Sequence, residues 1–211
     1  MNAFQLVTKQ LYFGVDALRL REASGRVMMR VHGQPPERAT VGLDTLAKDF
    51  RLSVRESRSM ADQMVQQGLL ERFHPQGSEF GITDKFRQYA QARIVEPLPR
   101  MRAQLLLTHM ADLALHFNQN AHRNKYEIEA LAVFGSFMSR EPELPELSVG
   151  VTLRRRSPNA RQIAGRATVP NGGHEQVREL FEKLSSFVQL RFFRRVQDVP
   201  RPFTVFLKDE I

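Results

Sequence analysis

The sequence contains no cysteine. That absence excludes disulfides, thiolate zinc sites, iron–sulfur clusters and cysteine nucleophiles. No apolar run reaches the roughly 18 residues that a membrane-spanning helix needs, so no transmembrane segment is expected. The N-terminus lacks a basic stretch followed by an apolar core, and no signal peptide is predicted. We therefore expect a protein of the bacterial cytoplasm, a reducing compartment.

Several catalytic and binding motifs are also missing. The chain has no P-loop, no G-x-G-x-x-G, no G-x-S-x-G nucleophile elbow and no H-E-x-x-H zinc motif. His109 and His116, seven residues apart, are better explained as exposed helix positions than as metal ligands. Tryptophan is absent, which leaves Phe192-Phe193 as a small candidate for stacking on single-stranded bases. We predict no metal site, no catalytic residue and no cofactor.

Acidic residues are scarce toward the C-terminus. Over the whole chain 31 Lys and Arg oppose 23 Asp and Glu, for a net charge of +8. Residues 154–208 alone hold 12 basic and 4 acidic side chains, and ten of the basic ones are Arg. The planar fork of Arg grips phosphate oxygens in pairs, so this excess indicates either a nucleic-acid partner or a solvated basic face. The candidate phosphate contacts are Arg154, Arg155, Arg156, Arg191, Arg194 and Arg195.

The most legible pattern lies in residues 40–93. We predict a helix over 45–50 capped by Asp44. A second helix over 54–67 opens with Ser53 and Glu56 in the spacing of a capping box and ends at Gly68. The pattern then predicts strands over 71–74 and 79–82 joined by a tight turn, and a helix over 85–93 that Thr83 and Asp84 open. An earlier helix is expected over 11–29.

The stretches LDTLAKDFRLSVRESRSMADQMVQQGLLER and FGITDKFRQYA resemble winged helix-turn-helix DNA-binding domains of the broad MarR- and GntR-like class. The resemblance implies that the second helix enters the DNA major groove and that the hairpin is a wing. Arg reads guanine and Gln reads adenine. Glu56 and Asp62 would repel phosphate, but Glu56 serves the cap and Asp62 is expected to pair with Arg58 at i,i+4. The candidate DNA-binding residues are Ser53, Arg55, Arg58, Ser59, Gln63, Arg72, His74 and Gln76.

For the whole chain we predict an α+β fold with three parts. Residues 1–97 form the winged helix-turn-helix domain, residues 98–125 a connecting helix, and residues 126–211 a small α/β domain. The connecting helix carries an apolar stripe that suits a dimer seam or an ordinary core helix equally well, formed by Leu106, Met110, Leu113 and Phe117. In the last part we expect a turn at 171–173, a helix over 175–184, and strands over 128–134, 147–153, 187–196 and 203–207.

The stretch ALAVFGSFMSREPELPELSVGVTL resembles the first motif of nucleotidyltransferases related to DNA polymerase β. In that superfamily a Gly-Ser turn holds nucleotide phosphates, and an Asp-x-Asp on the next strand helps to bind two Mg²⁺ ions. Gly135 and Ser136 match the turn, but Ser148 and Gly150 occupy the two Asp positions. The resemblance therefore implies that residues 126–211 form a nucleotidyltransferase-like domain that is degenerate and non-catalytic, with a vestigial nucleotide site.

Together these features predict a sequence-specific DNA-binding protein, most plausibly a transcriptional regulator. It would bind double-stranded DNA as a homodimer in the cytoplasm or nucleoid, and its C-terminal domain would serve sensing, dimerisation or extra DNA contact. The effector is unknown. Two alternatives stay open. One is a divergent nucleotidyltransferase tethered to nucleic acid, and the other is a DNA-binding adaptor of a mobile-element or plasmid maintenance complex.

Overall fold

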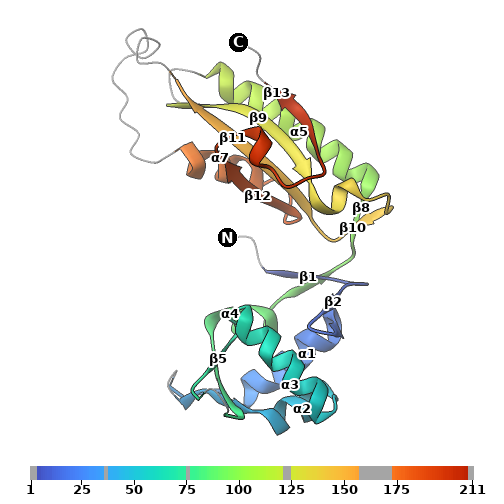
Figure 1. The fold of residues 1–211 in the computed structure, drawn as a ribbon, viewed down its shortest axis with the longest axis vertical. Helices are drawn as coiled ribbons and strands as arrows, with labels where there is room; N and C mark the ends of the chain where they lie inside the picture. The colour runs from blue at the N-terminus through green and yellow to red at the C-terminus, as the bar shows by residue number, and fades with distance from the viewer. Residues whose placement is uncertain (1–3, 36–37, 75–76, 121–124, 157–172, 209–211) are drawn as a thin grey trace. The chain divides into compact units, whose positions relative to one another are not determined.

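The computed structural model describes residues 4–35, 38–74, 77–120, 125–156 and 173–208. Helices and small sheets mix along these ranges, which confirms the α+β class. The chain divides into two compact units, one reaching Glu96 and the other beginning at Pro97 (Figure 1). Among the described helices, none has the length and apolar character to cross a membrane.

The first unit combines four helices with short strands. Its elements in chain order are β1 (Gln5–Val7), β2 (Leu11–Tyr12), β3 (Val15–Asp16), α1 (Ala17–Arg30), β4 (Thr40–Gly42), α2 (Leu43–Phe50), α3 (Val54–Gln66), β5 (Leu70–Arg72), β6 (Glu79–Ile82), α4 (Asp84–Ala90) and β7 (Arg93–Val95). Strands β5, β6 and β4 form an antiparallel sheet with β6 in the middle. Strand β1 pairs in parallel with β7.

Three helix boundaries in this unit differ from the prediction. Helix α1 begins at Ala17 rather than at residue 11, because β2 and β3 first form a small hairpin whose turn contains Gly14 at φ +83°. Helix α2 begins at Leu43 after Gly42, so Asp44 lies inside its first turn and is not the cap. Helix α4 ends at Ala90 with Gln91 as its C-cap, and Arg93, predicted as the last helical residue, begins β7.

One apolar cluster holds the first unit together. Leu20 of α1, Leu46 and Phe50 of α2, Met60 of α3 and Phe86 of α4 are all fully buried in it. The buried carboxylate of Asp49 joins two of the helices, since Arg30 of α1 donates to it from Nε at 3.1 Å and Nη2 at 2.7 Å. Those hydrogen bonds raise the pKa of Arg30 above its ordinary value. The helices around α3 are thus held together by a common apolar core and by the Arg30–Asp49 ion pair.

The second unit is built on a four-stranded sheet of order β12-β11-β9-β13. Its elements are β8 (Leu98–Pro99), α5 (Arg100–Gln119), β9 (Tyr126–Phe134), the 3₁₀ turn η2 (Gly135–Met138), β10 (Glu143–Leu144), β11 (Leu147–Arg155), α7 (Gly173–Glu182), β12 (Val188–Phe193), the 3₁₀ turn η3 (Val196–Asp198) and β13 (Phe203–Lys208). Strand β11 runs antiparallel to β9 and parallel to β12. Residues 171 and 172 of the predicted turn lie outside the described residues, and Gly173 begins α7.

Helix α5 belongs to the second unit. Ala103, Leu107, Met110 and Ala114 are buried in the same cluster as Val149 of the sheet. Of the predicted apolar stripe, Met110 is buried in that cluster, and Leu106, Leu113 and Phe117 are partly buried against it, as expected of a core helix. Val177 and Phe181 of α7 join the cluster too, and both helices therefore cover one face of the sheet.

Candidate nucleic-acid interface

The start of helix α3 is fixed by the capping box that the sequence predicts. The Ser53 Oγ accepts the Glu56 backbone N–H at 3.3 Å, and the Glu56 Oε2 accepts the Ser53 backbone N–H at 2.8 Å and its hydroxyl at 2.6 Å. These hydrogen bonds, from the Ser53 hydroxyl first and its backbone second, lower the pKa of Glu56. The Glu56 carboxylate is therefore engaged locally, in agreement with the prediction.

The end of α3 is equally well defined. Gly68 adopts φ +71°, a left-handed conformation that Gly takes at little cost. Its N–H donates to the Val65 carbonyl at 2.9 Å, and the Leu69 N–H donates to the Met64 carbonyl at 2.8 Å. This pattern is a Schellman motif, and it turns the chain directly from α3 into β5.

Helix α3 divides cleanly into a buried and an exposed face. Ser57, Met60, Ala61 and Met64 are buried. The predicted recognition residues are all exposed: Ser53, Arg55, Arg58, Ser59 and Gln63. Among them Gln63 Nε2 donates to Ser59 Oγ at 3.4 Å. The exposed face thus presents guanidinium, amide and hydroxyl groups, the types that read base edges.

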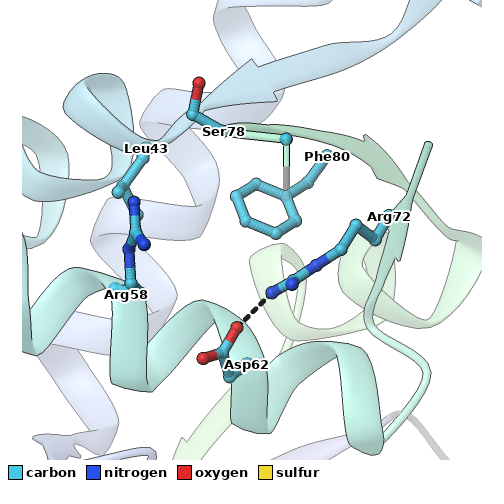
Figure 2. A pocket seen from close by; sticks show the side chains of 7 residues that line it. Leu43, Arg58, Asp62, Arg72, Ser78 and Phe80 are labelled. Carbon is cyan, nitrogen blue, oxygen red and sulfur yellow. Dashed lines mark hydrogen bonds and ion pairs between the residues drawn. The ribbon is translucent and has the colours of Figure 1, made fainter. Parts of the chain in front are cut away.

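Asp62 does not pair with Arg58 as predicted. It forms an ion pair with Arg72 of β5, because the hairpin brings that guanidinium across the face of α3 (Figure 2). The Arg72 guanidinium also lies over the Phe80 ring, with its carbon 5.5 Å from the ring centroid. Asp62 of α3 and Arg72 of the hairpin therefore tie the two elements together.

A cleft of about 380 Å³ opens between α3 and the β5–β6 hairpin. Figure 2 shows the Arg58 side chain rising from α3 on one side and Arg72 entering from β5 on the other. The cleft is lined by Leu43, Arg58, Asp62, Arg72, Gly77, Ser78 and Phe80. Ser78 is the lining residue whose role the sequence does not suggest, since a serine in a turn carries no signal of its own.

The tip of the hairpin is only partly described. His74 is exposed, and its carbonyl accepts the Gly77 N–H at 3.0 Å. Gln76, the third predicted hairpin contact, lies outside the described residues. Phe73 is half exposed and packs on Gly81, where an added Cβ would come within 3.0 Å of the ring. Phe73 also lines an open cavity of about 530 Å³ with His74, and no sequence motif indicated this surface aromatic.

In the second unit, the Gly-Ser turn lies beside Ser148, which the resemblance matches to the first Asp position. Gly135 has φ +69°, and an added Cβ there would be 3.6 Å from the Ser148 Oγ. Ser136 Oγ donates to the Glu146 carbonyl at 2.7 Å, and Ser148 Oγ donates to the Glu146 carboxylate at 2.7 Å. Both hydroxyls are thus used within the fold.

The position of the second missing acid is filled by packing. A Cβ on Gly150 would come within 3.0 Å of Val199 Cγ2 and 3.2 Å of the Phe193 ring. Ala132, Phe134 and Val199 form a small apolar cluster on this face, with Phe193 packed against it. A serine hydroxyl and a glycine cannot neutralise two divalent cations. The residues present therefore do not fit the paired Mg²⁺ ions of active nucleotidyltransferases.

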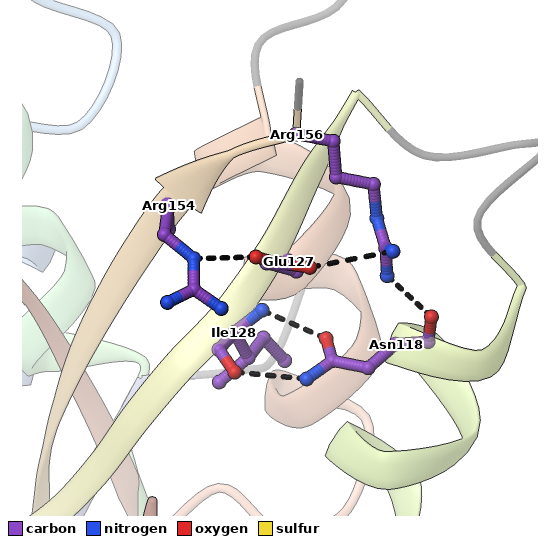
Figure 3. A network of polar contacts seen from close by, with 5 residues as sticks. All are labelled: Asn118, Glu127, Ile128, Arg154 and Arg156. Atoms are coloured by element: carbon purple, nitrogen blue, oxygen red, sulfur yellow. Dashed lines mark hydrogen bonds and ion pairs between the residues drawn. The ribbon is translucent and has the colours of Figure 1, made fainter. Parts of the chain in front are cut away.

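The three arginines at and just after the end of β11, Arg154 to Arg156, do not form one surface. Glu127 is buried, and its two carboxylate oxygens accept Arg154 Nε at 2.5 Å and Arg156 Nη1 at 3.3 Å (Figure 3). Arg156 also donates to the Asn118 carbonyl. A buried carboxylate needs such partners, so these two guanidinium groups turn inward. Arg155 is exposed.

The remaining predicted phosphate contacts are exposed on and after β12. Arg191, Arg194 and Arg195 all reach solvent, although the Arg191 guanidinium lies 5.6 Å from the centroid of Phe134. The neighbouring phenylalanines point to opposite faces of the sheet. Phe192 stacks on His174 at 4.5 Å, while Phe193 packs in the small cluster of Phe134. With both rings engaged, this pair is not a stacking platform.

Comparisons with protein-family models, curated proteins and solved structures gave no match to this chain. The function is therefore inferred from the residues themselves. Of the surfaces described, the face of α3 and the adjoining cleft bring together six of the eight predicted DNA-binding residues: Ser53, Arg55, Arg58, Ser59, Gln63 and Arg72.

Proposed function

We propose that this protein binds double-stranded DNA in a sequence-specific manner and regulates transcription. The observation that carries the proposal is the exposed face of α3. Arg55, Arg58, Ser59 and Gln63 are exposed there, while the opposite face is anchored in the core of the first unit. A rigid helix with such side chains is suited to the major groove, which admits an α-helix.

The order of elements around α3 supports the same proposal. Helix α2, a short turn, the capped helix α3 and the β5–β6 hairpin follow one another, as in a winged helix-turn-helix domain. Ser53 at the N-terminus of α3 leaves the first turn of that helix exposed, the part that approaches base edges in this class. The hairpin, with exposed His74 near its tip, is proposed as the wing.

The second unit is proposed to be nucleotidyltransferase-like but non-catalytic. Its Gly-Ser turn lies next to Ser148, and Gly150 is closed off by Phe193 and Val199. This unit would serve dimerisation, sensing or additional phosphate contact through Arg155, Arg194 and Arg195, which are exposed. Bacterial regulators of the winged-helix class bind as dimers because two half-sites multiply specificity.

The test begins with selection of bound duplexes from a random-sequence library by the full-length protein. We expect one enriched sequence, and we expect the combined substitution Arg55→Ala and Arg58→Ala to weaken binding to it by about 1–3 kcal/mol for each arginine that touches DNA. Folding should change by no more than about 0.5 kcal/mol per site, since both side chains are exposed.

A matched control removes the same charge elsewhere on the first unit. Arg93→Ala together with Arg21→Ala changes two exposed arginines that are not on α3. The control should retain the enriched sequence with little loss of affinity. Failure to enrich any sequence, or equal losses in both double variants, would contradict the assignment of α3 as the recognition helix.

A further inference from the structure

The charged side chains that line the cleft between α3 and the hairpin carry a net positive charge, because one ion pair neutralises only one of the two arginines. Three charged side chains line it: the guanidinium groups of Arg58 and Arg72 and the carboxylate of Asp62. Asp62 is paired with Arg72. No hydrogen bond or ion pair joins Arg58 to another residue in the part of the chain that the structure describes. One guanidinium is thus left over, which favours an anion.

The remaining lining groups fit an oxyanion. Ser78 is exposed, and its hydroxyl can donate, while its carbonyl already accepts the Leu43 N–H at 2.8 Å and holds the hairpin against the start of α2. Leu43 and Phe80 supply apolar walls. Figure 2 shows Arg58 and Asp62 rising from α3 on the lower side of the cleft, Ser78 at its upper edge and Arg72 entering from β5.

We propose that this cleft holds one backbone phosphate of the bound duplex, an inference that rests on the proposed DNA-binding function. Arg58 and Ser78 donate to the phosphate oxygens. Asp62 acts as a positioning residue, because it keeps Arg72 in place on the hairpin and so fixes the width of the cleft. Arg58 then contributes affinity and register, while sequence reading is left to Arg55 and Gln63.

A phosphate contact by Arg58 and a base contact by Arg58 would affect DNA binding in measurably different ways. A phosphate contact releases condensed counterions, so its loss reduces the salt slope of log K by about 0.9 and weakens binding almost uniformly across sequences. A base contact instead relaxes the preference at one position of the site.

The experiment compares full-length wild type, Arg58→Ala, Ser78→Ala and the control Arg93→Ala on two duplexes. One is the sequence enriched by wild type, and the other is a scrambled duplex of equal composition. Binding is measured between about 50 and 200 mM salt. We expect Arg58→Ala to lower the slope by about 0.9 and to reduce affinity for both duplexes by the same factor. Ser78→Ala should reduce both affinities alike without changing the slope, and Arg93→Ala should change neither.

The opposite pattern would overturn the assignment. An Arg58→Ala protein that keeps the wild-type slope and loses preference for the enriched duplex makes Arg58 a base reader. A wild-type protein that binds no duplex would instead remove the proposed function. Titration with inorganic phosphate, followed by NMR, then tests the cleft independently. A saturable shift of the Arg58 Nε–H resonance that is lost in Ser78→Ala would support an anion site in the cleft. The absence of any shift would contradict it.

Discussion

Glu56 has two requirements placed on it at once. It lies on the helix proposed to approach DNA phosphates, yet its carboxylate must stay ionised to accept from Ser53. The capping box resolves the conflict, because hydrogen bonds hold the charge at the very start of α3 and lower the pKa of Glu56. An ionised Glu56 stabilises the fold fully above its ordinary pKa, and that contribution is lost as the pH falls through the lowered folded value.

Replacing Glu56 with Gln should expose this dependence. The difference in urea midpoint between wild type and Glu56→Gln is expected to be largest near neutral pH and to shrink as the pH falls below about 4.5, the ordinary value for this group. Glu22→Gln, at an exposed position of α1, is the matched control and should show no such trend. A midpoint difference that stays constant from neutral to acid pH would argue against a charged cap.

At the same scale, local rules explain which residues could be predicted. Ser53, Glu56 and Gly68 follow from spacing within a few residues, because caps are local structures. The ion-pair partner of Asp62 could not be predicted from local spacing. The i,i+4 rule considers one helix only, whereas Arg72 reaches Asp62 through the fold of the hairpin. For the same reason Ser78 and Phe73 gave no signal.

At the scale of elements, the packing around Gly150 limits which side chains strand β11 can carry at that position. The side chains of Phe193 and Val199 pack against strand β11 at this residue, and an added Cβ would lie 3.0 Å from Val199 and 3.2 Å from Phe193, so these neighbours would have to shift. The sequence allowed Ser148 and Gly150 to be matched to the two Asp positions of the resemblance, but it did not reveal the packing at Gly150, because the partners Phe193 of β12 and Val199 after η3 lie more than forty residues later. The stripe on α5 was likewise visible in the sequence, while its partner, the sheet of the second unit, was not.

Placing an acid at Gly150 should therefore destabilise the fold rather than create a metal site. Gly150→Ala is expected to destabilise the second unit by about 1–3 kcal/mol through overpacking, and Gly150→Asp by more, because it also buries an unpaired charge. Urea unfolding measures both variants. Tight Mg²⁺ binding by the combined Ser148→Asp and Gly150→Asp protein, with unchanged stability, would refute the packing argument.

At the scale of the whole molecule, two separate apolar clusters divide the chain. One is built from residues between Leu6 and Ala92, and another from residues between Leu98 and Leu190. Composition and length allowed one domain or two, and the proline-rich stretch near Pro97 suggested the division. Each cluster is expected to unfold as its own cooperative unit.

Core truncations should separate the two transitions. Leu46→Ala removes a fully buried side chain from the first cluster, and Leu147→Ala does so in the second. Each is expected to lower the stability of its own unit by about 2–5 kcal/mol and to leave the other transition in place. Calorimetry with both variants measures this, and a single transition shifted equally by either substitution would mean that the units unfold together.

The basic excess also belongs to the whole molecule. Among the predicted phosphate contacts, Arg154 and Arg156 are engaged by Glu127 and Arg191 lies over the Phe134 ring. The exposed arginines Arg155, Arg194 and Arg195 are therefore the ones proposed for extra phosphate contacts. Replacing these three with Ser should flatten the salt slope of DNA binding by about 0.9 for each phosphate that they neutralise, without altering the enriched sequence. An unchanged slope, in a variant with the wild-type oligomeric state by light scattering, would leave them as a solvated face.

Asn118 has a consequence for how the molecule behaves in a crowded solution. Its side-chain amide donates to the Ile128 carbonyl at 2.9 Å and accepts the Ile128 N–H at 2.8 Å, on the stretch of β9 beyond the last residue paired with β13 (Figure 3). A single side chain there imitates a neighbouring strand. Both backbone polar groups of the buried Ile128 are thus satisfied by one side chain, so neither is left to recruit a foreign strand.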